Sequence, residues 1–402
     1  MDKLECLFCQ KSFPLDIFFP FCPLCQEPLL CPDPLSNKPG IPKAFPTIKN
    51  WYSWLPLSTY NPYLSLGEGR SPLIRCGNLL PSNELPPVFF KNESFNPTAS
   101  FKDRGTALAI QKAVSLGINK IGTVSTGNMA ASTAAYGAKA RITTYLLLKE
   151  DTSDQKARTP AVFGPKIFKV KADYGKLFTE SYSLGKKHGI YFMNSVDPFR
   201  IEGYKITGFE IFRQLNNKAP DFIFVPLSSG GHLIGLIRAF QNLGHSGTLR
   251  KFPVFVGVQA EGCAPLVRAF ERSESRFRRI PEGKTVAHSI SNPDPPGGNI
   301  VLKLIQKNKG VLVSVSDEEI LEAQKILAVK EGINCLPASA ASLAGFFKLK
   351  TSGRIKKNHI SVLIITGSGL KKLTPTDTSS DPCLSISLRK LDTVFSNERK
   401  IY

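Results

Sequence analysis

The chain has 402 residues, of which 42% are hydrophobic and 21% charged, and its formal net charge is +20. This length and apolar content exclude a disordered chain and leave room for two or three domains. No apolar run reaches about 18 residues and the N-terminus lacks a charged-then-apolar leader, so we expect no membrane span, no targeting signal and a cytoplasmic protein.

The positive charge raises the question of a nucleic-acid partner, since clustered Lys and Arg release counterions from phosphate backbones. Here the densest basic runs, residues 272–279 and 348–357, are short and are interrupted by Ser, Gly or Thr. We therefore expect no nucleic-acid function. The electrostatic field of this net positive charge would also attract an anionic, phosphorylated small substrate to the protein.

Four cysteines near the N-terminus, Cys6, Cys9, Cys22 and Cys25, have the spacing of a zinc ribbon. Two such knuckles bring four thiolates to one centre, so we expect a structural zinc or a similar soft metal in residues 1–32. Two disulfides are the competing interpretation, which a reducing cytosol disfavours. The remaining cysteines show no such spacing and are expected to be ordinary thiols: Cys31, Cys76, Cys263, Cys335 and Cys383.

Residues 94–105, with the sequence SFNPTASFKDRG, place one lysine at the start of an expected helix. Asn, Pro, Thr and Ser predict a turn and an N-terminal cap, so that Lys102 lies in the first helical turn. An amine there can be desolvated and its pKa lowered, as condensation with a cofactor aldehyde requires. The alternative for an isolated lysine is a solvated surface side chain, and three later segments argue against it.

Those three segments each place Ser, Thr or Gly directly after an apolar, strand-like run: residues 125–128, 228–235 and 366–369. Hydroxyls and glycines at a strand-to-helix junction can hold a phosphate, a carboxylate or a ring hydroxyl. The glycine run from Ser228 is weak on its own, because a plain glycine turn has the same pattern. The combination of the segments predicts a cofactor site.

Strand-like and helix-like segments alternate along the chain, which predicts an α/β fold with parallel sheets and helices on both faces. The expected strands are 143–148, 166–170, 190–194, 222–227, 254–259 and 361–365. The expected helices are 104–115, 129–140, 202–215, 233–243 and 317–330. Ser316 and Glu319 form a capping box at the start of the last helix.

Together these motifs resemble the tryptophan-synthase-β-like, fold type II pyridoxal phosphate enzymes, and the threonine synthase family most closely. The resemblance runs from about Leu66 to Lys371 and includes residues 67–73 and 96–105, similar to two family motifs. It implies two three-layer α/β lobes with largely parallel sheets. The large lobe would comprise residues 33–94 and 206–371 and the small, mobile lobe 95–205, after the zinc-ribbon-like residues 1–32 and before a polar tail, 372–402.

The resemblance also implies roles for single residues. Lys102 would condense with pyridoxal 5'-phosphate, Asn128 would bind its 3-hydroxyl and Thr366 would face its ring nitrogen. The backbone amides of the glycine run would hold the cofactor phosphate: Ser229, Gly230, Gly231 and His232. A further set would bind the substrate, O-phosphohomoserine, largely through its phosphate: Ser125, Thr126, Asn194, Ser195 and Arg200.

The activity so implied is the conversion of O-phosphohomoserine and water to threonine and phosphate, and the family leaves room for a homodimer. The chain departs from the family pattern at Met129, Ser228, Ser229, His232 and Leu336. These departures keep open a related replacement or elimination reaction on O-phosphoserine, serine or threonine. A non-catalytic zinc-ribbon protein that binds nucleic acid or a protein partner is the alternative from a different class.

Overall fold

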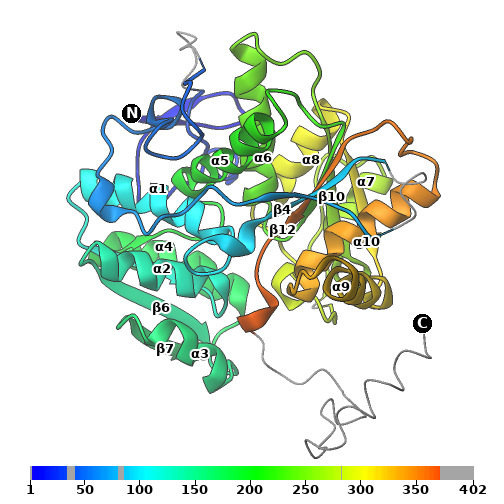
Figure 1. Ribbon diagram of the computed structural model, residues 1–402. Coiled ribbons are helices and arrows are strands. Elements are labelled where there is room, and N and C mark those ends of the chain that lie inside the picture. The colour runs from blue at the N-terminus through cyan, green and yellow to red at the C-terminus, as the bar shows by residue number, and fades with distance from the viewer. Residues whose placement is uncertain (1, 34–40, 80–85, 282, 372–402) are drawn as a thin grey trace, which may run out of the picture. The chain divides into compact units, whose positions relative to one another are not determined.

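The computed structural model describes residues 2–33, 41–79, 86–281 and 283–371 of the chain (Figure 1). By its internal contacts the chain divides into two compact units, Met1–Gly369 and Leu370–Tyr402. The predicted polar tail, 372–402, lies outside the described residues. The description below concerns the first unit.

A six-stranded sheet forms the larger α/β layer, with the strand order β11-β10-β9-β12-β4-β3. Its strands are β3 (Leu73–Arg75), β4 (Val88–Asn92), β9 (Phe222–Pro226), β10 (Val254–Ala260), β11 (Val311–Val315) and β12 (Ser361–Ile365). All neighbours are parallel except β3 and β4, which are antiparallel. The long crossovers between parallel strands are made by helices, as such connections require.

Helices cover both faces of this sheet (Figure 1). Because successive residues of a strand point to opposite faces, Ile223 and Val225 of β9 join one core and Phe222 and Phe224 join the other. The first core is completed by α5 (Pro198–Gln214), α6 (Gly231–His245), α7 (Pro265–Glu271) and α8 (Gly298–Lys307). The second is completed by α9 (Asp317–Glu331) and α10 (Pro337–Thr351).

A four-stranded, all-parallel sheet forms the second α/β layer, with the order β7-β6-β5-β8. Its strands are β5 (Lys120–Val124), β6 (Thr143–Lys149), β7 (Lys166–Val170) and β8 (Tyr191–Phe192). On one face Ala130 and Ala134 of α2 (Asn128–Lys139) pack on β6, and on the other Phe178 of α4 (Tyr174–His188) packs on β8. The predicted pair of three-layer α/β lobes is confirmed.

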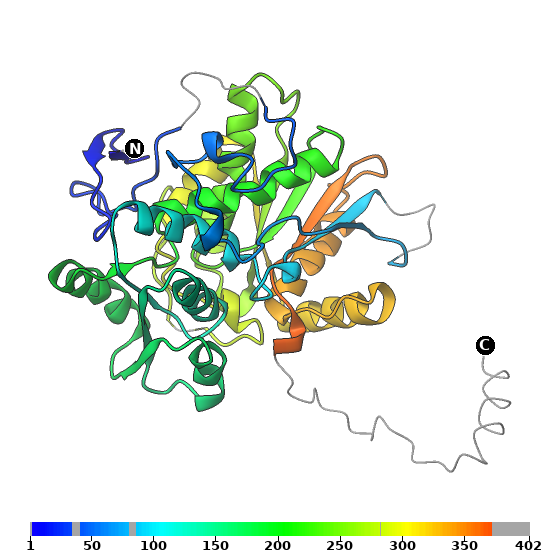
Figure 2. The same ribbon diagram turned by 60° about the vertical axis from the view of Figure 1, so that its left-hand side comes forward.

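Two further helices and a small sheet complete the described elements (Figure 2). Helix α1 (Lys102–Ser115) contacts both α5 and α2, and α3 (Asp154–Ala161) contacts α2. The N-terminal cysteine segment carries the antiparallel pair β1 (Lys3–Glu5) and β2 (Ser12–Pro14). Short 3-10 helices lie at Tyr52–Trp54, Pro62–Leu64, Glu93–Phe95, Glu261–Cys263, His288–Ile290 and Gly369–Lys371.

Every predicted helix and strand is present, with ends that differ by a few residues, and the strand predicted at 190–194 is reduced to Tyr191–Phe192. The capping box is confirmed, since Ser316 Oγ accepts a hydrogen bond from the Glu319 amide and Glu319 accepts one from the Ser316 amide. The elements that the sequence did not predict include α3, α4, α7, α8, α10, β3, β4 and β11. The lobe boundary at residues 95 and 205 stays a prediction.

One local prediction is wrong: no Asn, Thr or Ser side chain caps α1, whose N-cap is Phe101. Instead the Asp103 carboxylate accepts hydrogen bonds from the backbone amide and the hydroxyl of Thr98, both at 2.6 Å. An acidic residue in the first turn therefore closes the loop before the helix. No helix in the described part of the chain is both long and apolar enough to cross a membrane.

Candidate active site

The residues singled out from the sequence follow the carboxyl ends of parallel strands. Residues 125–128 follow β5, residues 227–232 follow β9 and residues 366–369 follow β12. The segment that leads to Lys102 follows β4, and residues 193–200 follow β8. Loops at the carboxyl ends of parallel strands are the usual place for ligands in α/β folds.

Lys102 begins α1, and its side chain is only partly exposed. Its Nζ lies 4.4 Å from the centroid of the Phe101 ring. Burial, and secondly the positive charge of Arg200, lower the pKa of Lys102 to about 7. Among the residues that the structure describes, no carboxylate forms an ion pair with this amine. A neutral, nucleophilic amine is therefore well populated at neutral pH.

The segment before Lys102 is held against the loop after β12. Ser100 and Gly367 form an isolated antiparallel bridge, and the Phe101 amide donates to the Thr366 carbonyl at 3.1 Å. A Cβ at Gly367 would lie 3.2 Å from the Asn128 Nδ2 atom, so Asn128 reaches the same place. The structure thus brings Lys102, Asn128 and Thr366 together, as the sequence predicts.

The segment after β9, Ser229 to His232, forms a cradle with two glycines at its centre. Gly230 has a φ of +96°, which favours glycine. A Cβ at Gly231 would come 2.5 Å from the Ser195 carbonyl oxygen, so the backbones approach too closely for any other residue. Gly231 is also the first residue of α6, which leaves the amides at this helix start directed toward the end of the strand. The cradle is suited to an anion.

His232 connects the cradle to the lysine segment. Its ring stacks on Phe101 with a centroid separation of 4.0 Å and an interplanar angle of 11°. Both ring nitrogens are buried and have no hydrogen-bond partner among the described residues. Burial lowers the pKa of His232 to about 3, so the imidazole is neutral. The sequence predicted a backbone contact at this residue but gave no sign of the stacking.

In the loop after β8, the Asn194 side chain is hydrogen-bonded within the protein, whereas the Ser195 hydroxyl is not. The Asn194 Oδ1 atom accepts from the Val124 amide at 2.8 Å, and its Nδ2 donates to Ser181 Oγ at 3.0 Å. Its amide group is therefore used to hold β5 and α4 together. Ser195 has a buried hydroxyl that makes no hydrogen bond with any described residue, and its carbonyl touches the cradle at Gly231.

Arg200 is fully buried in the first turn of α5. Its Nε donates to the Met193 carbonyl at 2.7 Å, and its two Nη atoms donate to the hydroxyls of Thr106 and Thr133 at 2.8 and 2.6 Å. No ion pair with a carboxylate is found for it within the described ranges. These three hydrogen bonds go to neutral oxygens, while burial raises the pKa of the nearby Asp197 carboxyl to about 6 and the charge of Arg200 opposes that rise. A buried guanidinium with neutral hydrogen-bond partners attracts an anion.

A buried ionic cluster, made of Lys91, Glu93, Arg104 and Glu210, lies behind the site. Arg104 Nε donates to Glu93 Oε2 at 2.5 Å, and its Nη1 donates to Glu210 Oε1 at 2.8 Å. Lys91 Nζ lies 2.6 Å from Glu210 Oε2. The cluster joins β4, α1 and α5. The sequence did not predict this cluster, because its residues come from segments that are far apart along the chain. The only signal was Arg104, which belongs to the Lys-Asp-Arg run of the lysine motif.

The cluster also fixes the first glycine motif. The Arg70 amide donates to Glu210 Oε1 at 2.8 Å, and Ser71 Oγ donates to Glu93 Oε1 at 2.6 Å. The Gly69 amide donates to Asn96 Oδ1 at 3.0 Å, which ties this motif to the lysine segment. Residues 69–71 and the loop that carries Lys102 are therefore held in one arrangement.

The four predicted cysteines are brought together. Their Sγ atoms all lie within 4.8 Å of one another, and those of Cys9 and Cys22 are 3.7 Å apart. These separations fit four thiolates around one tetrahedral zinc-sized ion. The cysteines at 31, 76, 263 and 335 are free and buried, as expected, and Cys383 lies outside the described residues.

The residues around Lys102 fit pyridoxal phosphate. A glycine cradle that a Cβ would fill suits the phosphate, and an amine with its pKa lowered to about 7 suits the aldehyde. The buried Ser100 and Ser195 hydroxyls and the His232 nitrogens lack partners among the described residues, and a polar ligand could supply them. The donors and the amine converge within one set of contacting loops.

Comparisons with known proteins agree with this arrangement. Residues 64–367 match the family described as "Pyridoxal-phosphate dependent enzyme". The chain is 38% identical over 322 residues to the threonine synthase of Methanocaldococcus jannaschii, a match that covers 80% of each chain. It is 34% identical over 376 residues to the threonine synthase of Methanosarcina acetivorans, a match that covers 92% of each chain.

Solved structures share the fold at lower identity. The processed form of threonine deaminase isoform 2 from Solanum lycopersicum matches with a TM-score of 0.64 and 20% identity over 81% of this chain and 82% of that one. The O-ureido-L-serine synthase matches with a TM-score of 0.65 and 18% identity over 80% of this chain and 98% of that one. At such identities these two structures support the two-lobed fold and nothing narrower.

Proposed function

Since the chain belongs to the pyridoxal-phosphate-dependent enzymes and, within them, to the threonine synthases, we propose that it converts O-phosphohomoserine and water to L-threonine and phosphate. In this reaction the bond from the γ carbon to the phosphate oxygen breaks, and the hydroxyl of water ends on the β carbon. A small phosphorylated amino acid is thus the proposed substrate.

The observation that carries the proposal is the position of Lys102. Its amine has a pKa of about 7 and lies in a segment bridged to Gly367 and stacked, through Phe101, on His232 of the cradle. We assign to Lys102 the covalent attachment of the cofactor. As a neutral amine it takes a proton from the α carbon of the substrate and later one from the β carbon, and once protonated it returns a proton to the γ carbon, which loses the phosphate and becomes the methyl group, and to the α carbon.

The cofactor would be held by the groups that surround this amine. The amides of Ser229, Gly230, Gly231 and His232 would bind its phosphate, and Asn128 would bind its ring hydroxyl. When bound, pyridoxal phosphate supplies an electron sink for the carbon from which a proton is removed.

Thr366 would face the ring nitrogen of the cofactor with a neutral hydroxyl. Its Oγ1 lies 2.8 Å from Ser339 Oγ, and Ser339 is fully buried in the first turn of α10. Ser339 Oγ also accepts from the Gly367 amide at 3.1 Å, which fixes its orientation. A hydroxyl so oriented, rather than a carboxylate, would leave the ring nitrogen without a proton.

The phosphate of the substrate would lie toward Ser195 and Arg200, with Ser125 and Thr126 at the amino-acid end. Arg200 supplies a buried positive charge, and Ser195 supplies a hydroxyl that no described residue uses. For Asn194 we propose a positioning role instead, because both atoms of its amide are bonded to the protein. It would hold the start of the 125–128 loop through Val124.

We further propose that Cys6, Cys9, Cys22 and Cys25 hold a structural zinc ion. Thiolate ligation needs reduced cysteines, and this supports a cytoplasmic protein. A homodimer stays a prediction, to be checked by light scattering of the purified chain. Metal analysis of the same sample should give about one zinc per chain.

Product analysis tests the reaction. The purified chain, given pyridoxal phosphate, should release phosphate and threonine from O-phosphohomoserine in equal amounts. Ammonia release from serine or threonine, or phosphate release from O-phosphoserine, should be slower. A faster reaction with any of these three would replace the proposed substrate, and a protein that neither binds pyridoxal phosphate nor is modified by borohydride in its presence would remove the enzyme assignment.

A further inference from the structure

We propose that the four-cysteine element positions the cofactor cradle through helix α8, so that metal ligation at the cysteines and cofactor affinity are coupled. The inference rests on the proposed cofactor site and extends it, because it assigns a positioning role to residues outside both sites. The residues in question are Glu27 on the cysteine element and Asn299 and Lys303 on α8.

The first cysteine knuckle is attached to α8 by one side chain. Lys303 Nζ donates to the Leu7 carbonyl at 2.8 Å and lies 4.8 Å from the centroid of the Phe8 ring. Leu7 and Phe8 are the two residues between Cys6 and Cys9, so their backbone position depends on how these two sulfurs are held. The Arg276 guanidinium lies on the same ring, 5.6 Å from its centroid.

The second knuckle is attached by another pair. Asn299 Nδ2 donates to Glu27 Oε1 at 2.8 Å, and Glu27 comes two residues after Cys25. The Asn299 side chain also accepts from the Phe277 amide at 3.1 Å, so it is bonded at both ends. Both knuckles thus contact the same helix, one at Asn299 near its start and the other at Lys303 one turn later.

The two knuckles share features of local geometry around the sulfur atoms. In each, the residue after the second cysteine has a positive φ, Gln10 and Gln26 both at 58°. An amide donates back to a sulfur at 3.4 Å in each, from Phe8 to Cys6 and from Cys25 to Cys22. Strained residues of this kind persist when the surroundings fix them, and a bound ion would do so.

The start of α8 lies directly on the cradle. The Gly297 amide, at the N-cap of α8, donates to the Ser229 carbonyl at 3.0 Å. A Cβ at Gly230 would lie 2.9 Å from Val301 Cγ2 and 3.1 Å from the Gly297 carbonyl oxygen. A shift of α8 would therefore displace Ser229 and Gly230, whose amides are proposed to bind the cofactor phosphate.

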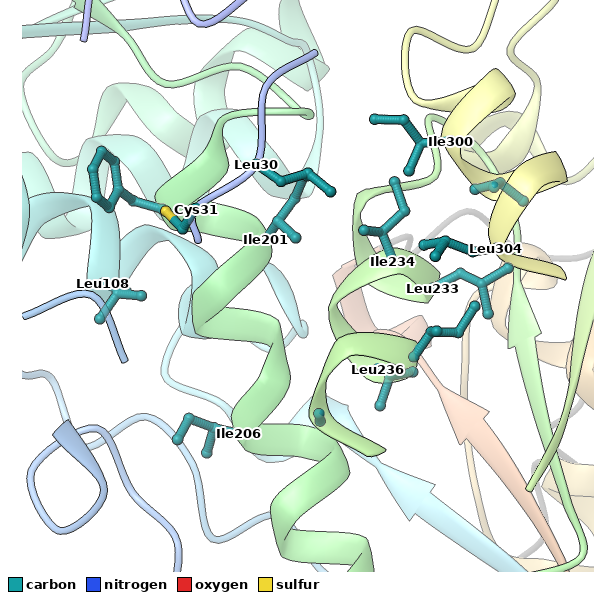
Figure 3. Close-up of a cluster of buried hydrophobic side chains, with 14 of the residues drawn as sticks. Leu30, Cys31, Leu108, Ile201, Ile206, Leu233, Ile234, Leu236, Ile300 and Leu304 are labelled. Atoms are coloured by element: carbon teal, nitrogen blue, oxygen red, sulfur yellow. The ribbon is translucent and has the colours of Figure 1, made fainter. Parts of the chain in front are cut away.

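The side chains of α8 also reach the helix that follows the cradle. Ile300 and Leu304 of α8 pack beside Leu233 and Ile234 of α6 (Figure 3). Interiors packed at this density transmit small displacements, since no free space absorbs them. The path from the sulfurs to the cradle thus consists of hydrogen bonds and packed contacts at each step.

Coupling of this kind can be measured as two dissociation constants for pyridoxal phosphate. The full chain is freed of cofactor and titrated with pyridoxal phosphate by absorbance, once with zinc bound and once after zinc removal by a chelator. We expect zinc removal to weaken pyridoxal phosphate binding by about 10-fold, within the roughly 5- to 150-fold range typical of coupled sites. Reciprocally, bound pyridoxal phosphate should slow zinc loss.

The Lys303→Met variant separates coupling from general loss of stability. It keeps all four cysteines and the cradle but removes the bond to Leu7. In the zinc-loaded form it should bind pyridoxal phosphate several-fold more weakly than the wild type, with a shifted 31P resonance of the bound phosphate. Zinc removal should then weaken binding less than in the wild type, because only the contact between Glu27 and Asn299 remains. Lys307→Met, at an exposed position on the same helix, is the matched control and should behave like the wild type.

Two results would overturn the inference. One is a zinc-free chain that stays folded by circular dichroism and binds pyridoxal phosphate as tightly as the zinc-loaded chain. If zinc removal unfolds the chain, the zinc-loaded Lys303→Met variant decides, and an unchanged dissociation constant and 31P resonance would count against coupling. Failure of the zinc-loaded wild type to bind pyridoxal phosphate at all would instead overturn the proposed function, and this inference with it.

Discussion

Two lysines, the fully buried Lys91 and the partly exposed Lys102, lie eleven positions apart and are used in opposite ways. Lys91 is fully buried, and its Nζ donates to the Ser71 carbonyl, Glu210 Oε2 and Gln214 Oε1 at 2.6 to 2.8 Å. Lys102 has no carboxylate partner within the described ranges, and the charge that acts on it is the positive one of Arg200. One amine has all three donors satisfied, whereas the other has no counter-ion among the described residues.

The difference shows how the fold separates stability from reactivity. Burial lowers the pKa of both amines, but for Lys91 the nearby Glu210 opposes the effect. A paired ammonium holds three elements of the chain together and does no chemistry. The amine of Lys102, which has no carboxylate partner among the described residues, lowers the stability of the fold. In return it can react with an aldehyde and can accept and donate protons. The predictions below test this contrast and the neutral imidazole of His232, which stacks on Phe101, the residue before Lys102.

The largest effect is expected from Lys102→Ala. Turnover of O-phosphohomoserine should fall by about 10⁴-fold or more, as when a catalytic nucleophile is removed, while the protein remains folded. Steady-state phosphate release and the visible absorbance of bound pyridoxal phosphate measure this. Lys91→Ala should give the reverse result, with less folded protein but near-normal activity per folded molecule. Comparable activity losses per folded molecule in both variants would contradict the contrast.

Glu210→Ala should be the most destabilising change in the ionic cluster. It leaves Lys91 and Arg104 buried without their shared carboxylate, and breaking a buried pair in this way costs about 3–5 kcal/mol. Urea unfolding followed by circular dichroism measures the loss. Glu210→Gln keeps one acceptor and should lie between the Ala variant and the wild type. A loss below about 1 kcal/mol in Glu210→Ala would show that the cluster is not a source of stability.

His232 predicts a dependence of stability on pH. Burial lowers its pKa to about 3 in the folded protein, so between this value and 6.5 the unfolded chain binds more protons. The contribution of His232 to the free energy of unfolding is therefore at its full value above about pH 6.5. Between about pH 6.5 and pH 3 it decreases as the pH falls, by up to about 1.4 kcal/mol per pH unit.

Urea unfolding at about pH 7, 6 and 5 tests this, with wild type compared with His232→Asn. The variant should lose less stability than the wild type as the pH falls, whereas His188→Asn, at an exposed site, should follow the wild type. Parallel curves for wild type and His232→Asn would mean that the His232 imidazole does not stay neutral in the folded protein.

The smallest effect concerns the charge beside Lys102. Removing the guanidinium in Arg200→Gln should raise the pKa of Lys102, because a nearby positive charge disfavours the ammonium form. The rate at which the cofactor-free protein reacts with pyridoxal phosphate should have its midpoint near pH 7 in the wild type and higher in the variant. At this pH the variant should be slower by roughly a few-fold.

Arg200→Lys keeps the charge and serves as the control for this measurement. Its midpoint should stay near that of the wild type, while its affinity for the phosphorylated substrate should fall, since an ammonium cannot form the planar contacts of a guanidinium. A midpoint that is the same in Arg200→Gln as in the wild type would remove Arg200 as a cause of the lowered pKa.

The sequence predicts much of the candidate site because the residues proposed to carry its chemistry lie in short motifs. The Ser100 to Asp103 segment, the glycines at 230 and 231 and the paired cysteines each show their residue types within a few positions. The role proposed for Asn194 and the stacking of His232 on Phe101 depend on contacts between segments far apart in the chain. No local pattern encodes such contacts, so motif comparison could not supply them.

The sequence alone determined the alternation of strands and helices and the residue types that end each strand, since hydrophobic period and turn chemistry act over a few neighbouring residues. The tertiary structure decided which strand ends meet, which of the lysines is paired, and that α8 links the cysteines to the cradle. These depend on the order of strands in the sheets and on burial, which arise only when distant segments pack together and exclude water.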